Sequence, residues 1–434
     1  MKSVQNTNVQ KCFYIDGPGG SGKTYLYRAL IEKFNLIHKK TLIVAWTGIA
    51  AILLPGGMMC HSAFSLPLDL STVKFPRLSQ SKREILKSLE LLIWDEALMA
   101  PGTALEIVDL VFQDLMDNKL PFGVKVVILG GDFRQVLPVV RKGSRGIQLS
   151  KNMRAITDPD FSQWLLNVGN GVITKPSSAK TNFSIKVPNS LLSNNIVTDI
   201  FGASFTCTDV QNISQRAILC SKNEHVRLIN ENVLALLQNS EKITFNAIDS
   251  VKNNDGSEND NLQVNIPVEY LNSLNPPGFP PFKLNIKLGC TVMLLRNLSV
   301  KNGLCNGTRL IVLGTRQNVI QCKINNGSFA GSVHFIPRIS LDTANDPALP
   351  FNFVRHQFPL NLAYALTINK SQGQTFEKVG IYLEDPCFSH GQLYTGCSRA
   401  MNSSSLKIQI KNNTLQGETI DGVVTDNIVY KEIF

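Results

Sequence analysis

The residues with the clearest chemistry lie near the start of the chain. Positions 17–24 read Gly-Pro-Gly-Gly-Ser-Gly-Lys-Thr and follow the apolar run 12–15 after a single Asp. A triphosphate concentrates negative charge, and glycines let a loop curl until its backbone N–H groups point at the phosphates. Lys23 can then reach the β- and γ-phosphates, and the Thr24 hydroxyl can hold Mg²⁺. The sequence therefore predicts a nucleoside triphosphate site formed by Gly17, Pro18, Gly19, Gly20, Ser21, Gly22, Lys23 and Thr24.

Two further segments end apolar runs with groups that suit phosphate chemistry. Asp95 and Glu96 follow the run 91–94, and Gln135 follows the run 124–129. In a phosphate-loop enzyme the first carboxylate supports Mg²⁺ and the second accepts a proton from the attacking water. A Gln in the third position can bind the γ-phosphate or that water. Because open α/β sheets bind ligands at the carboxyl ends of their strands, we expect all three beside the loop.

Other candidates are weaker when the residues are taken alone. A forked, permanently charged donor suits the charge that develops on a γ-phosphate, and Arg154 and Arg399 are candidates, although a lone arginine is usually a solvated surface residue. The segments 47–51, 61–64 and 367–375 are small and hydroxyl-rich, which suits contacts to phosphates and sugars but also an ordinary polar loop. His61 lies beside Cys60, yet the absence of a second ligand cluster nearby in the sequence argues against a metal site.

Composition limits the class of protein. The 434 residues are 43% hydrophobic and 18% charged, which predicts a folded protein of two or three domains. Positions 1–6 lack the apolar stretch of a secretory signal, and no run approaches the roughly 18 apolar residues of a membrane span. The nine cysteines include no C-x-x-C pair, which argues against structural zinc and disulfides and predicts an intracellular location.

Positive charge is concentrated in two segments of a chain whose net charge is +10. No acidic residue occurs between Glu269 and Asp342, and a second acid-free run extends from Arg134 to Arg154. Such runs are either solvated basic faces or a track for a polyanion, and a neighbouring triphosphate site favours the polyanion. The basic residues of the first run are Lys283, Lys287, Arg296, Lys301, Arg309, Arg316, Lys323 and Arg338.

Patterning along the chain predicts an α/β fold with an all-β insertion. Residues 1–150 alternate strand and helix signals, as expected for a mostly parallel sheet covered on both faces. Short apolar runs and Asn-Gly pairs predict a small basic β-barrel over 284–356. Strand and helix signals return afterwards, so we assign 151–283 and 357–434 to a second α/β domain. The sequence leaves the oligomeric state open.

In combination these segments resemble the petite-integration-frequency (PIF) family of superfamily 1B DNA helicases, and most closely its eukaryotic Helitron-type branch. The likeness extends from Phe13 to about Ile410. It implies two RecA-like domains with ATP between them, a β-barrel inserted in the second, and 5′→3′ movement on single-stranded DNA with duplex unwinding. The implied partners are ATP, single-stranded DNA and duplex junctions, and Mg²⁺ is the implied cofactor. Such an enzyme would serve repair, recombination, telomere maintenance or transposon replication in the nucleus, or alternatively in the mitochondrion.

The resemblance also implies roles for particular residues. It makes Lys23 and Thr24 the phosphate and metal contacts, Asp95 and Glu96 the metal and catalytic carboxylates, Gln135 the γ-phosphate sensor, and Arg154 and Arg399 the arginine fingers. Gly373 would belong to the ATP site. The implied DNA contacts are Thr47, Gly48, His61, Lys370, Ser371, Arg296 and Arg309.

Three departures from the family pattern lead to a rival hypothesis. Only about eleven residues precede Cys12, so the helix carrying an adenine-reading Gln is expected to be missing and the chain to be a fragment. A helix-length segment is expected to be absent before Arg154, and Asn369 stands where many relatives have His. The alternative is a truncated, transposon-derived protein that binds DNA without ATP turnover. A nucleotide-switch ATPase acting on proteins is a third hypothesis, but it does not explain the basic barrel.

Overall fold

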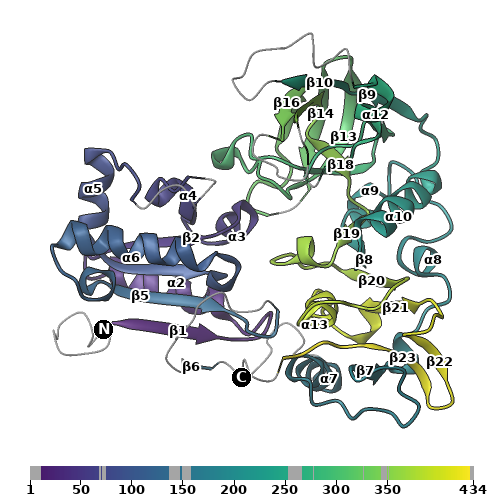
Figure 1. The fold of residues 1–434 in the computed structure, drawn as a ribbon, viewed down its shortest axis with the longest axis horizontal. Helices are drawn as coiled ribbons and strands as arrows, with labels where there is room; N and C mark the ends of the chain where they lie inside the picture. Colours follow the sequence, from purple (N-terminus) through teal and green to yellow (C-terminus); the bar gives the residue numbers. More distant parts are fainter. Residues whose placement is uncertain are drawn as a thin grey trace. The chain divides into compact units, whose positions relative to one another are not determined.

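The computed structural model describes residues 11–67, 70, 75–135, 147–148, 158–252, 266–276, 278–325, 327–343, 349 and 351–430. The chain folds into two compact units (Figure 1). The first comprises Met1–Ile196, Leu219–Lys222 and Thr367–Phe434, and the second comprises Val197–Ile218 and Asn223–Leu366. No described helix is both long enough and apolar enough to cross a membrane.

The first unit begins with a six-stranded parallel sheet of order β3-β2-β4-β5-β1-β6. Period-2 alternation along β4 sends Trp94 to one apolar core, with Phe112 of α6, and Ile93 to another, with Tyr27 of α2. Helices therefore cover both faces, which confirms the predicted α/β arrangement. The elements are β1 (Cys12–Asp16), α2 (Lys23–Asn35), β2 (Lys40–Ala45), α3 (Gly48–Leu53), β3 (Met58–Met59), α4 (Cys60–Phe64), α5 (Gln80–Lys87), β4 (Leu89–Asp95), α6 (Gly102–Met116), β5 (Val126–Gly131) and β6 (Ile147–Gln148).

A second α/β layer follows later in the chain. Its four-stranded sheet has the order β19-β8-β20-β21, and a small antiparallel sheet has the order β22-β23-β7. Its strands β20 and β21 pair in parallel. The elements are α7 (Pro159–Asn170), β7 (Ser184–Lys186), β8 (Arg216–Cys220), β19 (Ala365–Thr367), β20 (Lys378–Leu383), α13 (Gln392–Cys397), β21 (Leu406–Ile410), β22 (Gly417–Thr419) and β23 (Gly422–Asp426).

The second unit contains the predicted all-β module, with different edges. Its sheets have the orders β15-β14-β13-β12-β18, β10-β17-β16 and β11-β9. The strands β9 and β10 pair with β11 and β17, so the predicted boundaries at 284 and 356 cut through paired strands. The elements are α8 (Ile196–Phe201), α9 (Val210–Ile213), α10 (Asn223–Leu236), β9 (Ile243–Asn246), β10 (Ile248–Lys252), α12 (Val268–Ser273), β11 (Lys283–Ile286), β12 (Thr291–Leu294), β13 (Arg309–Arg316), β14 (Val319–Ile324), β15 (Val333–Pro337), β16 (Ile339–Asp342), β17 (Asn352–Gln357) and β18 (Leu360–Leu362).

A buried ion pair fixes β10 against β17. Asp249 and Arg355 are register partners, and both side chains are fully buried. The Arg355 guanidinium donates to both carboxylate oxygens, at 2.8 and 2.7 Å, and to the carbonyl of Pro280 at 3.1 Å. Two parallel N–H···O bonds of this kind are among the strongest that side chains form. Removing one partner would leave the other charge buried and uncompensated.

We therefore expect Asp249→Asn to lower the free energy of unfolding by about 3–5 kcal/mol, the usual cost of breaking a buried pair. The measurement is the thermal and guanidinium unfolding of the full chain, followed by circular dichroism. Glu90→Gln is the matched control, because it breaks the exposed pair with Lys39 (3.1 Å), and such pairs contribute about 1 kcal/mol or less. Equal destabilisation by the two substitutions would contradict this prediction.

Candidate nucleotide-binding site

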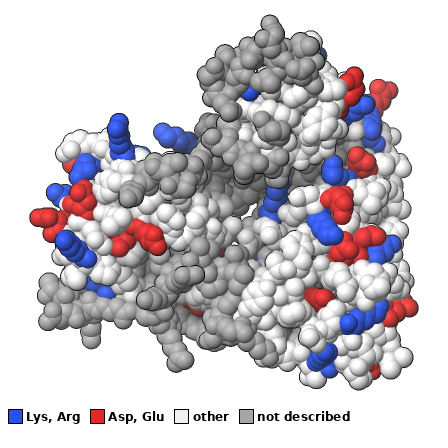
Figure 2. All heavy atoms as spheres, in the orientation of Figure 1, with Lys and Arg blue, Asp and Glu red and all other residues white. Residues whose placement is uncertain are grey.

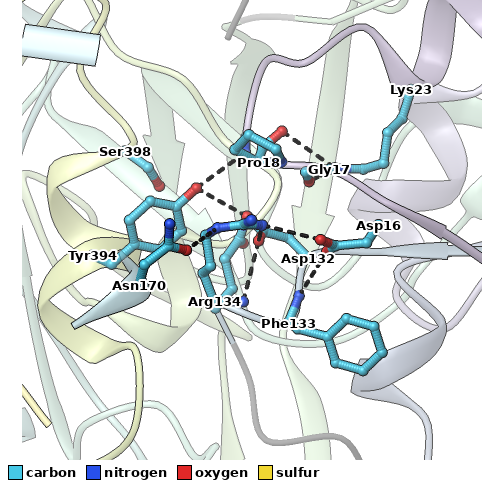
Figure 3. A network of polar contacts seen from close by, with 12 residues as sticks. Asp16, Gly17, Pro18, Lys23, Asp132, Phe133, Arg134, Asn170, Tyr394 and Ser398 are labelled. Carbon is cyan, nitrogen blue, oxygen red and sulfur yellow. Dashed lines mark hydrogen bonds and ion pairs between the residues drawn. The ribbon is translucent and has the colours of Figure 1, made fainter. Parts of the chain in front are cut away.

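The phosphate-loop sequence forms a tight turn between β1 and α2. Gly20 and Gly22 have φ of 82° and 90°, a left-handed conformation that strains any residue with a Cβ. The Gly17 N–H donates to the carbonyl of Gly131 at 3.1 Å, which holds the loop at the carboxyl ends of β1 and β5. Lys23 begins α2, and its ammonium donates to the carbonyls of Gly17 and Pro18 (Figure 3). The positive end of a helix and the Lys23 charge thus converge on one loop.

The two predicted carboxylates lie at the carboxyl end of β4, where Asp95 is the last residue of the strand and Glu96 the next residue. Tyr27 of α2 donates its hydroxyl to Asp95 at 2.9 Å, across the backbone of Gly130. A Cβ on Gly130 would lie only 1.7 Å from the Tyr27 oxygen, so only glycine permits this contact. Burial raises the pKa of Asp95, and the nearby Lys23 charge opposes the shift.

Glu96 has a strained backbone and a perturbed acidity. Its φ of 50° is left-handed, which is uncommon for a residue with a Cβ. Burial, and then the charge of Asp95, raise the pKa of Glu96 to about 7, whereas Lys23 and Arg399 act in the opposite direction. A carboxylate with a pKa near neutrality is well matched to proton abstraction from water.

Asp132, directly after β5, is the centre of a buried polar network (Figure 3). Its Oδ2 accepts from Gln135 Nε2 at 2.7 Å and from the Tyr394 hydroxyl at 3.0 Å. Its Oδ1 accepts from Arg134 at 3.2 Å, and Arg134 also donates to Asp16 at 3.2 Å. The network thereby fixes the side chain of Gln135, the predicted γ-phosphate sensor, within the strand-end segment.

Tyr394 connects this network to the phosphate loop. Its hydroxyl accepts from the Gly19 N–H at 3.4 Å while donating to Asp132. The neighbouring Thr395 donates to the carbonyl of Gln135 at 3.3 Å. Helix α13 therefore contacts both the loop and the sensor segment, although it belongs to the second α/β layer.

Of the two predicted arginine fingers, Arg399 is described and Arg154 lies outside the described residues. Arg399 is 2% exposed and donates to the carbonyls of Thr395 (3.0 Å) and Gln374 (3.2 Å) and to the hydroxyl of Ser398 (2.7 Å). Burial lowers the pKa of Arg399, and the negative charge of Glu96 opposes that shift. Arg399 thus lies within electrostatic reach of the candidate base.

The predicted DNA contacts in the first unit have mixed surroundings. Thr47 caps α3 by accepting from the Ala50 N–H at 3.3 Å, and Gly48 is buried as the first residue of that helix. The His61 ring lies 4.4 Å from that of Trp46, and burial lowers the pKa of His61, which favours the neutral imidazole. The Lys370 side chain is exposed. Gly373 has a left-handed φ of 76° and open space where a Cβ would lie.

Two of the predicted DNA contacts, Ser371 and Arg309, have buried side chains that bind backbone carbonyls of the chain itself. Ser371 is fully buried and donates to the carbonyl of Ile368 at 2.6 Å, so its hydroxyl closes a turn. Arg309 is 1% exposed and donates to the carbonyls of Ser214 (2.8 Å), Arg216 (3.0 Å) and Ala363 (2.7 Å). Burial lowers the pKa of Arg309 to about 10. Both residues bind the chain's own backbone.

Fewer basic residues of the acid-free run 270–341 are available to bind a polyanion than the sequence indicates. Arg296 is half-buried and donates to the carbonyl of Leu295 at 3.2 Å, and Lys287 donates to that of Leu237. Arg338 donates to the carbonyl of Asn246 at 2.8 Å. On the face that Figure 2 shows, the described Lys and Arg side chains lie among Asp and Glu side chains. Several cations of the acid-free run therefore serve the fold.

Sequence reasoning missed Tyr394, Asp132, Arg134 and Tyr27 as members of the site. Asp132 and Arg134 lie in the hexapeptide 130–135, where only Gln135 was singled out. The available signal was a charged pair, Asp132 and Arg134, at the end of a buried strand. Tyr394 carried no such signal, because its partners are far away in the sequence.

The comparisons with known proteins agree with this geometry. A PIF1-like helicase model matches residues 1–158, and a model of the DNA helicase Pif1 2B domain matches residues 269–315. The chain is 28% identical over 416 residues to the ATP-dependent DNA helicase Pif1 of Bdellovibrio bacteriovorus. The matched region covers 91% of this chain and 83% of that relative. The chain is therefore similar to PIF1-like helicases over most of its length. Its likeness to the Helitron-type branch stays a prediction.

Solved structures of the same family share the fold. A crystal structure of Bacteroides Pif1 bound to single-stranded DNA has a TM-score of 0.66 and 26% identity, covering 95% of this chain and 93% of that one. A structure of two coordinating Pif1 helicases that unwind forked double-stranded DNA has a TM-score of 0.64 and 25% identity, covering 95% and 92%. The predicted α/β fold with two RecA-like domains is therefore confirmed.

The acidity of Glu96 predicts how nucleotide hydrolysis by this chain depends on pH. A general base must be deprotonated, so kcat should fall about tenfold per pH unit below about 7, as Glu96 takes up its proton. Glu96→Gln should lower kcat by about 10²- to 10⁴-fold and flatten the residual profile, with nucleotide binding retained. The measurement is steady-state phosphate release between pH 5.5 and 9. A wild-type profile that is flat from pH 5.5 to 8 would exclude Glu96 as the titrating base.

The position of Tyr394 predicts a loss of hydrolysis without a loss of folding. Tyr394→Phe removes one hydroxyl and leaves both Asp132 and the Gly19 N–H with one partner fewer, a cost of about 1–3 kcal/mol. We expect kcat to fall by roughly five- to 150-fold at that cost, by the same measurement.

Tyr364→Phe is the matched control, because the Tyr364 hydroxyl is also buried and accepts from the Thr291 N–H at 3.2 Å in the second unit. It should lower the unfolding temperature and leave kcat unchanged. If both substitutions lower kcat equally, the effect of Tyr394 is one of stability alone.

Proposed function

We propose that this chain is an ATP-dependent DNA helicase that moves 5′→3′ on single-stranded DNA and unwinds duplexes at junctions. One observation carries the proposal: the chain of hydrogen bonds from Gly19 through Tyr394 and Asp132 to Gln135. It links the phosphate loop to a helix of the second α/β layer. A change in the bound phosphates can therefore alter the conformation of that layer. The relatives' activity and DNA-bound structures support the same function.

Each part of the site has a role in phosphoryl transfer. Lys23 would move from the loop carbonyls to the phosphates, and Glu96 would take the proton of the attacking water. Gln135, held by Asp132, would orient that water or the γ-phosphate. Arg399 would supply positive charge to the transition state if phosphate oxygens replaced its present carbonyl partners.

The residues present also fit Mg²⁺. Thr24 and Asp95 offer a hydroxyl and a carboxylate, and Mg²⁺ prefers such hard oxygen donors, usually few in number and completed by water. Burial raises the pKa of Asp95, and the nearby Lys23 charge acts against that shift by favouring the ionised carboxylate. Mg²⁺, when bound, would neutralise β- and γ-phosphate oxygens.

The direction of movement and the cellular location rest on the family resemblance. We propose a nuclear location for a DNA helicase of this branch. Because phosphate contacts carry no sequence information, binding should show little sequence preference and should weaken steeply with salt. The pathway served, whether repair, recombination, telomere maintenance or transposon replication, is part of the same proposal.

The central test is ATP hydrolysis by the full chain with and without single-stranded DNA. We expect stimulation by DNA and loss of turnover in Lys23→Ala, because the loop then lacks the charge that reaches the phosphates. Lys39→Ala is the control, since that lysine pairs with Glu90 on the surface and should not affect turnover. Tight DNA binding without hydrolysis would instead identify a truncated, transposon-derived DNA-binding protein.

Tailed duplexes test the direction. The proposal expects unwinding of a 5′-tailed duplex and not of a 3′-tailed one, measured by release of a fluorescent strand. The opposite preference would overturn the direction while leaving the helicase activity in place. An ATP hydrolysis rate that single-stranded DNA does not change would exclude a helicase and favour a nucleotide switch acting on proteins.

A further inference from the structure

The outer face of β13, β14 and β15 presents an aromatic ring near a glycine, Gly314, whose position we call the floor of this face. The strand register places Gly314, Gln321 and Phe335 side by side across the three strands. Residues paired directly across strands point to the same face of a sheet. Phe335 is 65% exposed on the edge strand β15, and Gly314 contributes no side chain. This row therefore combines one exposed ring with a position that has no side chain and with the partly exposed Gln321.

Two cations lie on this same face. Lys323 pairs with Val333, and Arg316 pairs with Val319, so both are an even number of residues from the row that contains Phe335. Arg316 is exposed and Lys323 half-buried, and neither forms an ion pair within the part of the chain that the structure describes. The sequence holds no acidic residue from 270 to 341, so β13, β14 and β15 contain none. We call Gly314, Arg316, Gln321, Lys323 and Phe335 the Phe335 face.

We propose that the Phe335 face is a binding site for single-stranded DNA, separate from the contacts predicted at Arg296 and Arg309. One base stacks on Phe335 over the floor at Gly314, and the Gln321 amide bonds to the edge of that base. Lys323 and Arg316 contact the flanking phosphates. The nature of the ligand rests on the proposed helicase function, whereas the site itself rests on the strand register and exposure.

Charge and shape favour a nucleic acid over a protein on this face. Base–aromatic stacking accepts any sequence, since every base has a π-face, and it needs only one accessible ring. The exposed apolar surface is small, because Val333 is the one other large hydrophobic residue of β15 that is exposed. An apolar protein partner would leave Lys323 and Arg316 without counter-charges, whereas a phosphate backbone supplies them.

The experiment measures binding of fluorescein-labelled oligothymidine to the full chain by anisotropy, over a range of salt concentrations. Phe335→Ala should weaken binding by roughly five- to 150-fold, the usual effect of losing one stacked base. Lys323→Gln and Arg316→Gln should each reduce the slope of log affinity against log salt by about 0.7, the value for one phosphate of a single strand. Tyr270→Ala is the matched control, because it removes a 49% exposed ring on α12 in the same unit and should change neither quantity.

Two further measurements keep the proposal open to contradiction. Gly314→Leu fills the floor and should weaken binding about as much as Phe335→Ala, with an unfolding temperature near that of the wild type. An oligonucleotide carrying 5-iodouracil should photocrosslink to the peptide that contains Phe335. If the wild type binds DNA and its hydrolysis is stimulated, but Phe335→Ala binds equally well, the Phe335 face is excluded and the helicase function stands. If the wild type does not bind DNA, both are excluded.

Discussion

The buried carboxylate of Asp132 is the constraint on which the rest of the site depends. An ionised carboxylate removed from water costs several kcal/mol unless its oxygens accept strong hydrogen bonds. Asp132 is 2% exposed, and its donors are Arg134, Gln135 and Tyr394. Because these donors come from the end of β5 and from α13, satisfying one charge fixes two segments that are far apart in the sequence. The geometry of the sensor and that of the phosphate loop therefore have a common origin.

The same constraint explains why the neighbouring acids have unusual properties. Burial raises the pKa of both Asp95 and Glu96, and the negative charge of Asp95 raises the pKa of Glu96 further. Lys23 and Arg399 oppose this effect but do not cancel it, which leaves the pKa of Glu96 raised to about 7. Burial and the surrounding charges together thus give Glu96 a pKa near neutrality, which suits a proton acceptor. Residue type alone does not produce it.

The sequence predicts those parts of the fold and site that depend on local rules. Glycines at positive φ mark the loop, and the apolar stripe that includes Val108 and Phe112 marks α6, because both patterns reflect contacts within a few residues. The strands β9 and β10 were missed because their partners lie far along the chain. Likewise, the β13–β14 turn consists of Gln317 and Asn318, and no Asn-Gly pair marks it. Hydrogen-bonded pairing between distant strands determines where these strands form, and local sequence patterns do not encode that pairing.

The sequence predicts poorly which basic residues are available to bind a polyanion, and the reason is physical. A segment without acids still has to satisfy its own polar backbone, and a guanidinium has five donors for that purpose. Arg309 consequently donates to three backbone carbonyl groups. Arg355, which lies just beyond the acid-free run, finds a carboxylate at Asp249 on β10 and is buried as an ion pair. Whether a basic residue serves the fold or a polyanion therefore depends on the carbonyl and carboxylate groups within its reach. Cations such as Arg316 and Lys323, which form no ion pair within the described residues, can be counted toward a DNA surface.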